Sequence, residues 1–356
     1  MHSAETLARH DAVGGLNRGA AFGESAAMGA RRRLLVALVA LVAAAVVVAA
    51  ILALVSSSSG DNTTSVTTSS FSLATTPPPT TFVGGPRRWC DLARPPVAVG
   101  ALQGRALREV SGAVVSRRHA GVLWIHNDSG DRARVFAIDT SGNVLAEVRL
   151  SNVVANDWED ITILPGSGGA PDTIVVADIG DNLAQRTSVQ LIRFAEPELP
   201  ADPTVPLVID EALAETFVYD QPHDAEAVFA DPLSRKVFLV TKEFVDPPQL
   251  FLAGPALGDD TRRLQQLGAV EVPLAQLVTA ADAAADGAAI LLRTSDEVLV
   301  YERLANETMA ATFAREPCRA PVPLEPQGEA LAIAPDGSGF YLIGEGRSAT
   351  IWFVGV

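Results

Sequence analysis

The sequence predicts an all-β fold, a β-propeller of five blades that follows one transmembrane helix. Three observations predict it: a β-rich unit that recurs five times, an additional strand before the first unit, and a long uncharged apolar run near the N-terminus. Units of four short strands that repeat about every 40–50 residues are typical of propellers. The repeat therefore defines the main domain, and the apolar run defines how that domain is tethered.

The recurring unit begins with a small or acidic residue and contains three apolar strands joined by turns rich in Gly, Pro and Asp. The unit starts lie 48, 67, 56 and 47 residues apart, and they are Ser111, Glu159, Glu226, Asp282 and Glu329. Short strands between turn residues at this spacing indicate an all-β domain. The 67-residue interval leaves room for a degenerate sixth blade. Two separate β domains are the alternative to a single ring.

A fourth strand is expected in each of the first four units, at residues 144–150, 215–220, 267–272 and 308–313. The fifth unit has none, because the sequence stops at Val356 directly after its third strand. An unpaired blade edge would expose a row of backbone donors and acceptors. We expect residues 95–102 (PPVAVGAL), which precede the first unit, to complete the fifth blade and to close the ring.

The uncharged apolar run covers residues 34–55. At about 1.5 Å per residue, a helix of this length spans roughly 33 Å, close to the thickness of a bilayer core. A cleaved signal peptide is the alternative, but its apolar core is normally about 7–15 residues long. Residues 31–33 are arginines, and the next basic residue is Arg87. The positive-inside rule therefore places residues 1–33 in the cytoplasm and the chain after residue 55 outside the cell membrane.

Composition divides the rest of the chain. Residues 1–33 are rich in Ala and Gly without apolar periodicity, which predicts a disordered cytoplasmic arm. Residues 56–86 are rich in Ser, Thr and Pro and predict an extended stalk, so residues 87–356 form the extracytoplasmic propeller. The net charge of the whole chain is −15. Residues 1–33 carry +2, so residues 34–356 carry −17. This acidity argues against nucleic acid as a partner. The preference for Arg over Lys suggests a bacterial source.

The two cysteines of the chain flank the predicted ring closure. Cys90 precedes the closing strand, and Cys318 precedes the fifth unit. An extracytoplasmic compartment favours a disulfide between them, since no other thiol competes. Two free buried cysteines are the alternative. A bridge would tie the two ends of the ring together.

Six motifs carry a resemblance to known propellers: SGAVVS (111–116), WIHNDSGD (124–131), DWEDITI (157–163), VADIGDN (176–182), HDAEAV (223–228) and QGEALAI (327–333). From these motifs the domain resembles bacterial extracytoplasmic propellers that are loosely related to phytase-like, gluconolactonase-like and paraoxonase-like proteins. The resemblance implies a divalent ion at the channel mouth, held by Glu, Asp and Asn. The ligand pattern of those families does not match position by position, and they usually have six blades.

The innermost strand of each blade lines the central channel, so the five unit starts are expected to converge at one mouth. Carboxylates that converge repel one another unless they are protonated or neutralised by a cation, and hard oxygen ligands suit Ca²⁺ or Mg²⁺. The predicted metal ligands are Glu159, Asp160, Asp178, Asp181, Asn182, Glu226, Asp282 and Glu329. Other polar residues expected at the channel are Ser111, Asn127, Asp128, Lys242, Glu243, Arg293 and Glu345. The alternative is a metal-free polar network in which Lys242 and Arg293 neutralise the acids.

Motifs for common catalytic machinery are absent from the sequence: it has no nucleophile elbow, zinc-protease helix, phosphate-binding loop or dinucleotide-binding glycine motif. His126 and His223 lie beside polar residues at the predicted mouth and are the candidates for a general base. A hydrogen-bonded structural role is the alternative for both.

Two functional classes remain. The first is a membrane-tethered binding module that meets an envelope protein or a small ligand, which the stalk favours because it projects the domain without dictating chemistry. The second is a divalent-metal-dependent hydrolase of the lactonase or phosphoesterase type, with its site at the channel mouth. The acidic domain disfavours a phosphorylated substrate unless Ca²⁺ bridges it.

Overall fold

The computed structural model describes residues 88–253, 262–325 and 327–356. The predicted cytoplasmic arm, transmembrane helix and stalk (1–33, 34–55 and 56–86) lie outside these residues. None of the helices in the described part of the chain combines the length and the apolar character needed to cross a bilayer.

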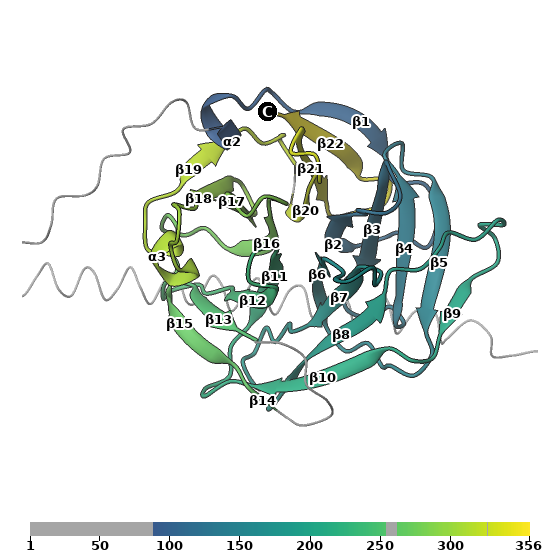
Figure 1. Cartoon of the computed structure of the whole chain (residues 1–356), viewed down its shortest axis with the longest axis horizontal. Helices are drawn as coiled ribbons and strands as arrows, with labels where there is room; N and C mark the ends of the chain where they lie inside the picture. Colours follow the sequence, from purple (N-terminus) through teal and green to yellow (C-terminus); the bar gives the residue numbers. More distant parts are fainter. Residues whose placement is uncertain (1–87, 254–261, 326) are drawn as a thin grey trace, which may run out of the picture. The chain divides into compact units, whose positions relative to one another are not determined.

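Five β-sheets surround a central channel, which confirms the predicted all-β propeller (Figure 1). The innermost strand of each blade is almost wholly buried. These inner strands are β2 (Val110–Val115), β6 (Trp158–Leu164), β11 (Ala225–Asp231), β16 (Val278–Ala283) and β20 (Gly328–Ile333). Each begins one of the five predicted units, so the sequence repeat corresponds to the blades.

The remaining strands follow outward in antiparallel order. Blade 1 adds β3 (Val122–Asn127), β4 (Arg134–Asp139) and β5 (Val144–Leu150), and blade 2 adds β7 (Thr173–Asp178), β8 (Val189–Ala195) and β10 (Leu213–Val218). Blade 3 adds β12 (Lys236–Thr241), β13 (Gln249–Leu252) and β15 (Gln265–Ala269). Blade 4 adds β17 (Ala289–Thr294), β18 (Val298–Glu302) and β19 (Cys318–Ala320), and blade 5 adds β21 (Gly339–Gly344), β22 (Thr350–Gly355) and β1 (Val97–Ala101).

The long interval between the second and third units does not contain a sixth blade in the described chain. It contributes β9 (Leu207–Ile209), which joins the outer edge of blade 1 in parallel with β5. A second short parallel strand, β14 (Arg262–Arg263), covers the outer edge of blade 2 beside β10. The added residues of the long interval therefore widen blade 1, and β14, from further along the chain, widens blade 2.

The ring closes as predicted. Strand β1 pairs antiparallel with β22, with Ala98 opposite Trp352, so both ends of the domain meet in blade 5. A disulfide joins Cys90, in the short helix α2 (Arg88–Asp91), to Cys318 of blade 4, with 6.2 Å between their Cα atoms. One closed ring thus replaces the alternative of two separate β domains.

The fourth strand predicted at residues 308–313 is wrong. This segment forms the helix α3 (Met309–Phe313), and β19 supplies the outer strand of blade 4 instead. Thr308 caps the helix by accepting a hydrogen bond from the backbone of Ala311 at 3.2 Å. Met309 and Phe313 are four residues apart, so both side chains lie on the buried face of the helix.

The hydrophobic core lies between neighbouring blades. Alternate residues of one strand contact opposite neighbours, because side chains alternate across a β-sheet. In β7, Ile174 and Val176 belong to the cluster shared with blade 1, whereas Val175 and Ala177 belong to the cluster shared with blade 3. Because both faces of β7 are buried against neighbouring blades, the middle of the strand must be apolar, and its ends are free to carry polar groups.

Candidate functional site

A β-bulge interrupts each inner strand near its start, at the same structural position in all five blades. A bulge adds one residue to a strand and redirects its side chain. The five bulged residues are Ser111, Glu159, Glu226, Thr279 and Glu329. Four of these are predicted unit starts, so the bulge explains why polar residues recur there.

Asp282 is the exception, and its predicted place at the mouth is wrong. The equivalent residue in blade 4 is Thr279, and Asp282 lies three residues further along β16. Its carboxylate accepts backbone hydrogen bonds from Ala283 and from Ile333 of blade 5, each at 2.8 Å. It lines a separate small cavity together with Ile163 of β6. This acid joins two blades instead of facing the mouth.

A polar cavity of about 170 Å³ opens at the mouth, where the bulged residues converge. Seven carboxylates and a single lysine, Lys242, are the charged groups among the described residues of its lining. The lining residues are Glu109, Val110, Ser111, Asp128, Ser129, Asp157, Glu159, Asn182, Glu226, Lys242, Gln327, Glu329 and Glu345. The cavity is therefore strongly acidic.

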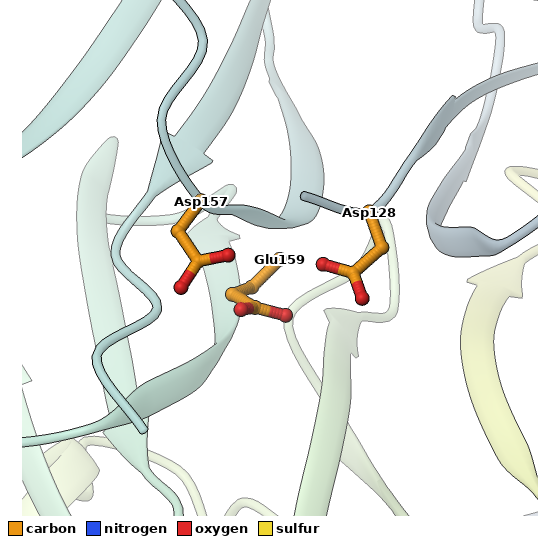
Figure 2. A group of neighbouring side chains, drawn as sticks. All are labelled: Asp128, Asp157 and Glu159. Carbon is orange, nitrogen blue, oxygen red and sulfur yellow. The ribbon is translucent and has the colours of Figure 1, made fainter. Parts of the chain in front are cut away.

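Three of these carboxylates form a close group that we call the mouth triad: Asp128, Asp157 and Glu159. Each offers one oxygen, and the three oxygens lie within 4.8 Å of one another (Figure 2). Asp128 follows the end of β3, Asp157 precedes β6, and Glu159 is the bulged residue of β6. The end of the second strand of blade 1 and the start of the first strand of blade 2 thus supply the group.

Asp157 was not among the ligands predicted from the sequence. The sequence nevertheless indicated its position, because Asp157 and Glu159 are two residues apart and side chains two residues apart on a strand lie on the same face. Eight of the residues predicted at the channel do line the cavity: Ser111, Asp128, Glu159, Asn182, Glu226, Lys242, Glu329 and Glu345.

Burial opposes ionisation of the mouth triad. Glu159 is 5% exposed, and burial raises its pKa well above the ordinary value, with repulsion from Glu226 and Asp128 adding to the effect. Burial and repulsion from Asp128 raise the pKa of Asp157 to about 6. A bound cation would offset both the burial and the mutual repulsion, since it favours the charged form of each carboxylate.

The local contacts leave Glu159 poorly satisfied. The Ser111 hydroxyl donates to the backbone carbonyl of Glu159 at 2.6 Å, so its one proton is used there, and the Glu159 Oε2 atom lies 3.5 Å away. A side chain at Gly180 would overlap the Glu159 Oε1 atom and would lie 2.7 Å from Asp157 Oδ2. Gly180 therefore provides the room that the two carboxylates occupy.

Lys242 is engaged by a different acid. It forms an ion pair with Glu226 across the cavity wall. Burial alone would lower the pKa of Lys242, but the attraction of Glu226 outweighs it, and the pKa is raised. Glu329 accepts a hydrogen bond from the Gln327 side chain at 2.6 Å. These acids have partners of their own, whereas none of the mouth triad forms an ion pair within the described chain.

Asp160 does not face the cavity, although it adjoins Glu159. Its carboxylate is fully buried and accepts hydrogen bonds from the backbone of Val228 at 2.9 Å and of Ala281 at 3.1 Å. It also accepts the backbone N–H of Ile161 at 2.8 Å. This residue connects blades 2, 3 and 4, and a structural role replaces the predicted metal-binding role.

Asp178 and Asp181 bind Arg186 and do not line the cavity. The Asp178 carboxylate pairs with the Arg186 guanidinium at 2.7 Å, and Asp181 accepts the backbone N–H of Arg186 at 2.6 Å. The turn that carries these two predicted metal ligands is thus closed by an arginine. Asn182, at the end of this turn, is the member that reaches the cavity.

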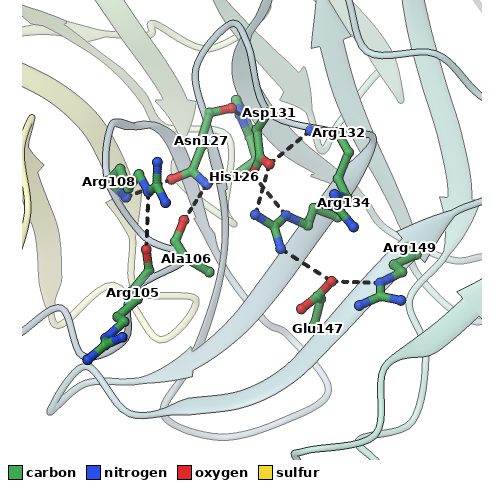
Figure 3. Close-up of polar contacts among 10 residues, drawn as sticks. All are labelled: Arg105, Ala106, Arg108, His126, Asn127, Asp131, Arg132, Arg134, Glu147 and Arg149. Atoms are coloured by element: carbon green, nitrogen blue, oxygen red, sulfur yellow. Dashed lines mark hydrogen bonds and ion pairs between the residues drawn. The ribbon is translucent and has the colours of Figure 1, made fainter. Parts of the chain in front are cut away.

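His126 and Asn127 serve the framework beside the mouth (Figure 3). His126 is fully buried, its Nδ1 atom lies 3.0 Å from the Asn127 carbonyl, and its ring packs edge-on against Trp158. Burial lowers its pKa to about 4. Asn127 donates to the Ala106 carbonyl at 2.8 Å and to Asp131 at 2.7 Å. Neither residue lines the cavity.

The remaining predicted residues also lie outside the cavity lining. His223 contacts Glu243, with 2.9 Å between Nδ1 and the carboxylate, and packs against Phe251. Arg293 pairs with Glu325 and donates to the Ala330 carbonyl at 3.2 Å. The two histidines are therefore separate from the acidic group.

The fold and the site together define a five-bladed β-propeller with an acidic channel mouth. No known family matches the sequence, and no curated protein does. Similar solved structures include a glucose dehydrogenase, with a TM-score of 0.45 and 9% identity over 74% of this chain and 100% of that one. A gluconolactonase from Xanthomonas campestris gives 0.44 and 11%, over 75% and 90%. The WD40 repeats of RRP9 give 0.36 and 13%, over 68% and 66%. The likeness is one of fold.

Proposed function

We propose that this chain is a membrane-anchored extracytoplasmic binding module whose mouth triad binds a divalent cation, Ca²⁺ or Mg²⁺. The observation that carries the proposal is the approach of three carboxylate oxygens to within 4.8 Å of one another, without an ion-pair partner in the described chain. Carboxylate oxygens are the ligands that both ions prefer. Ca²⁺ takes about six to eight oxygens, so three carboxylates leave positions for water or for a bound group.

The dimensions of the cavity favour binding over hydrolysis. Its volume of about 170 Å³ is below the roughly 300–1,000 Å³ of typical small-molecule sites. Neither histidine that the sequence offered as a general base lies in its lining. The alternative of a lactonase or phosphoesterase would need a larger pocket and would have to use one of the cavity carboxylates for proton transfer. The small volume therefore makes the binding module the better supported function.

The proposed location rests on the predicted transmembrane helix at 34–55, with residues 1–33 in the cytoplasm. The disulfide between Cys90 and Cys318 supports an oxidising compartment for the propeller. Proteolysis of intact cells tests this topology. We expect an epitope at the C-terminus to be removed and one at the N-terminus to be protected.

Elemental analysis of the purified full-length chain, followed by thermal melting with and without EDTA, tests the binding function. We expect about one divalent ion per chain and a melting temperature that EDTA lowers. An ion that binds only the folded state at 100 times its Kd stabilises that state by about 2.7 kcal/mol. A chain that holds no ion and melts identically in CaCl₂, MgCl₂ and EDTA would exclude the proposed cation site.

A further inference from the structure

The most exposed apolar side chains of the described chain lie on loops at the mouth end of the blades. Thirteen large apolar side chains are exposed in the described chain, and the six most exposed are Val154, Leu183, Phe244, Val245, Leu274 and Leu324. These six, which we call the apolar rim, have exposed fractions of 72–101%, against 39–64% for the other seven. Large apolar groups exposed together are typical of interaction sites.

Three rim residues adjoin residues that line the cavity. Leu183 directly follows Asn182, Phe244 comes two residues after Lys242, and Val245 comes next. The loops that carry them connect the second and third strands of blades 2 and 3.

The other three rim residues lie on loops that enter the next blade at the same end. Val154 precedes β6 by four residues, and Leu274 precedes β16 by the same number. Leu324 precedes β20 by four residues as well. The rim thus comes from blades 2 and 3 and from three connections between blades.

The opposite end of the channel provides the contrast. Leu233 lies next to Pro232, which lines the small cavity that contains Asp282. It is 64% exposed and belongs to the turn between the first and second strands of blade 3. The mouth end therefore carries the rim, and Leu233 is a matched leucine on the other end.

The charge of the cavity indicates which kind of partner would bind beside the apolar rim. Seven carboxylates and one lysine line the cavity, so the mouth stays negative even when a divalent ion is bound. A partner that covers these apolar side chains would exclude water around the cavity, which strengthens the attraction between the acidic cavity and an opposite charge on that partner. The cavity volume of about 170 Å³ admits one side chain and excludes a folded element.

We propose that the mouth face docks an extracytoplasmic protein segment that presents a Lys or Arg side chain between apolar residues. The basic group enters the acidic cavity, and its apolar neighbours pack on the rim. This inference rests on the proposed binding function and names the class of partner.

The charge pattern disfavours the other occupants. A second copy of the chain presents the same acidic mouth, so two mouths repel each other. Anionic lipid is repelled for the same reason. The stalk, residues 56–86, contains no basic residue that could fill the cavity.

A peptide selection tests the proposal. The full-length chain in phosphatidylcholine nanodiscs is panned against a displayed library of random 12-residue peptides, in CaCl₂ and in EDTA. We expect enriched peptides to share a Lys or Arg flanked by apolar residues. Acetylation of that lysine should weaken binding at least tenfold. Leu274→Ser and Phe244→Ser should also weaken binding at least tenfold, whereas Leu233→Ser should change it less than twofold.

Several results would overturn the inference: no enrichment, enriched peptides without a basic residue, or equal weakening by Leu274→Ser and Leu233→Ser. Rim-dependent self-association without peptide, or rim-dependent binding to protein-free phosphatidylcholine vesicles, would also overturn it by identifying another occupant. If the chain binds Ca²⁺ but selects no basic peptide, the docking proposal is wrong and the cation site remains supported. If the chain selects basic peptides but binds no ion, only the proposed cation site is wrong.

Discussion

The Oδ2 atom of Asp160 in blade 2 lies 2.9 Å from the backbone nitrogen of Val228 in blade 3. The same oxygen accepts the backbone N–H of Ala281 in blade 4. One buried carboxylate therefore bonds three blades around the channel, directly below the residue that the mouth triad uses. The two adjacent acids at the start of β6 therefore have different roles: Asp160 connects the blades, and Glu159 faces the cavity.

Replacing Asp160 by alanine should destabilise the ring severely. Three buried backbone N–H groups lose their acceptor, and each unsatisfied group costs about 1–3 kcal/mol. We expect Asp160→Ala to lower the free energy of unfolding by about 3 kcal/mol or more, measured by chemical denaturation. Asp286→Ala, at an exposed turn, is the control. A loss at Asp160 no larger than that of the control would contradict the bridging role.

The disulfide should stabilise the closed ring. Cys90 and Cys318 are 228 residues apart in sequence, for which the chain-entropy model gives an upper figure of about 5 kcal/mol. We expect a reducing agent to lower the melting temperature of the wild type. The double variant Cys90→Ser, Cys318→Ser should melt at the lower temperature whether or not the agent is present. Equal melting of all samples would show that closure does not depend on the bridge.

Gly180→Ala should damage the mouth triad more than the fold. The added methyl group would overlap Glu159 and crowd Asp157, so the carboxylates must move apart. We expect the affinity for Ca²⁺ to fall at least tenfold, measured by calorimetric titration. Gly355→Ala is a matched control, because its added atom would meet neighbours only at ordinary distances of 3.7 Å and more. Wild-type affinity in Gly180→Ala would show that the glycine does not shape the site.

The stability of the propeller should depend on Asp282. Burial raises the pKa of this carboxyl from 3.8 to about 7. The folded state therefore retains a proton that the unfolded state releases near its ordinary pKa, and stability falls as pH rises from about 4 through about 7. Asp282→Asn removes this ionisation, so its melting temperature should fall less than that of the wild type over this range. Parallel curves for the two proteins would contradict the assignment.

The blades could be predicted from the sequence because their signals are local. Apolar strands, turn residues and the missing fourth strand of the last unit were enough to place β1 beside β22. The error at 308–313 arose because a short apolar segment fits a strand or a helix equally well. Thr308 as a cap and the four-residue spacing of Met309 and Phe313 decide for the helix.

The site was predicted in part. Glu159, Glu226 and Glu329 follow from the repeat, since the bulge recurs with the blade. Asp282 was misplaced because no residue pattern marks the bulge of β16, and a shift in register changes which side chain faces the mouth. His126 shares a strand face with Trp124, two residues earlier, and that alternation already indicated the blade interface.

Calorimetric titration of the chelator-treated full-length chain with CaCl₂ and MgCl₂ tests the cation site most directly. We predict one site per wild-type chain, and at least a hundredfold weaker binding in Glu159→Gln, which keeps the size of the side chain and removes its charge. Asp286→Asn should bind as the wild type does. Equal binding by the wild type and Glu159→Gln, or binding by neither, would contradict a divalent-cation site at the channel mouth.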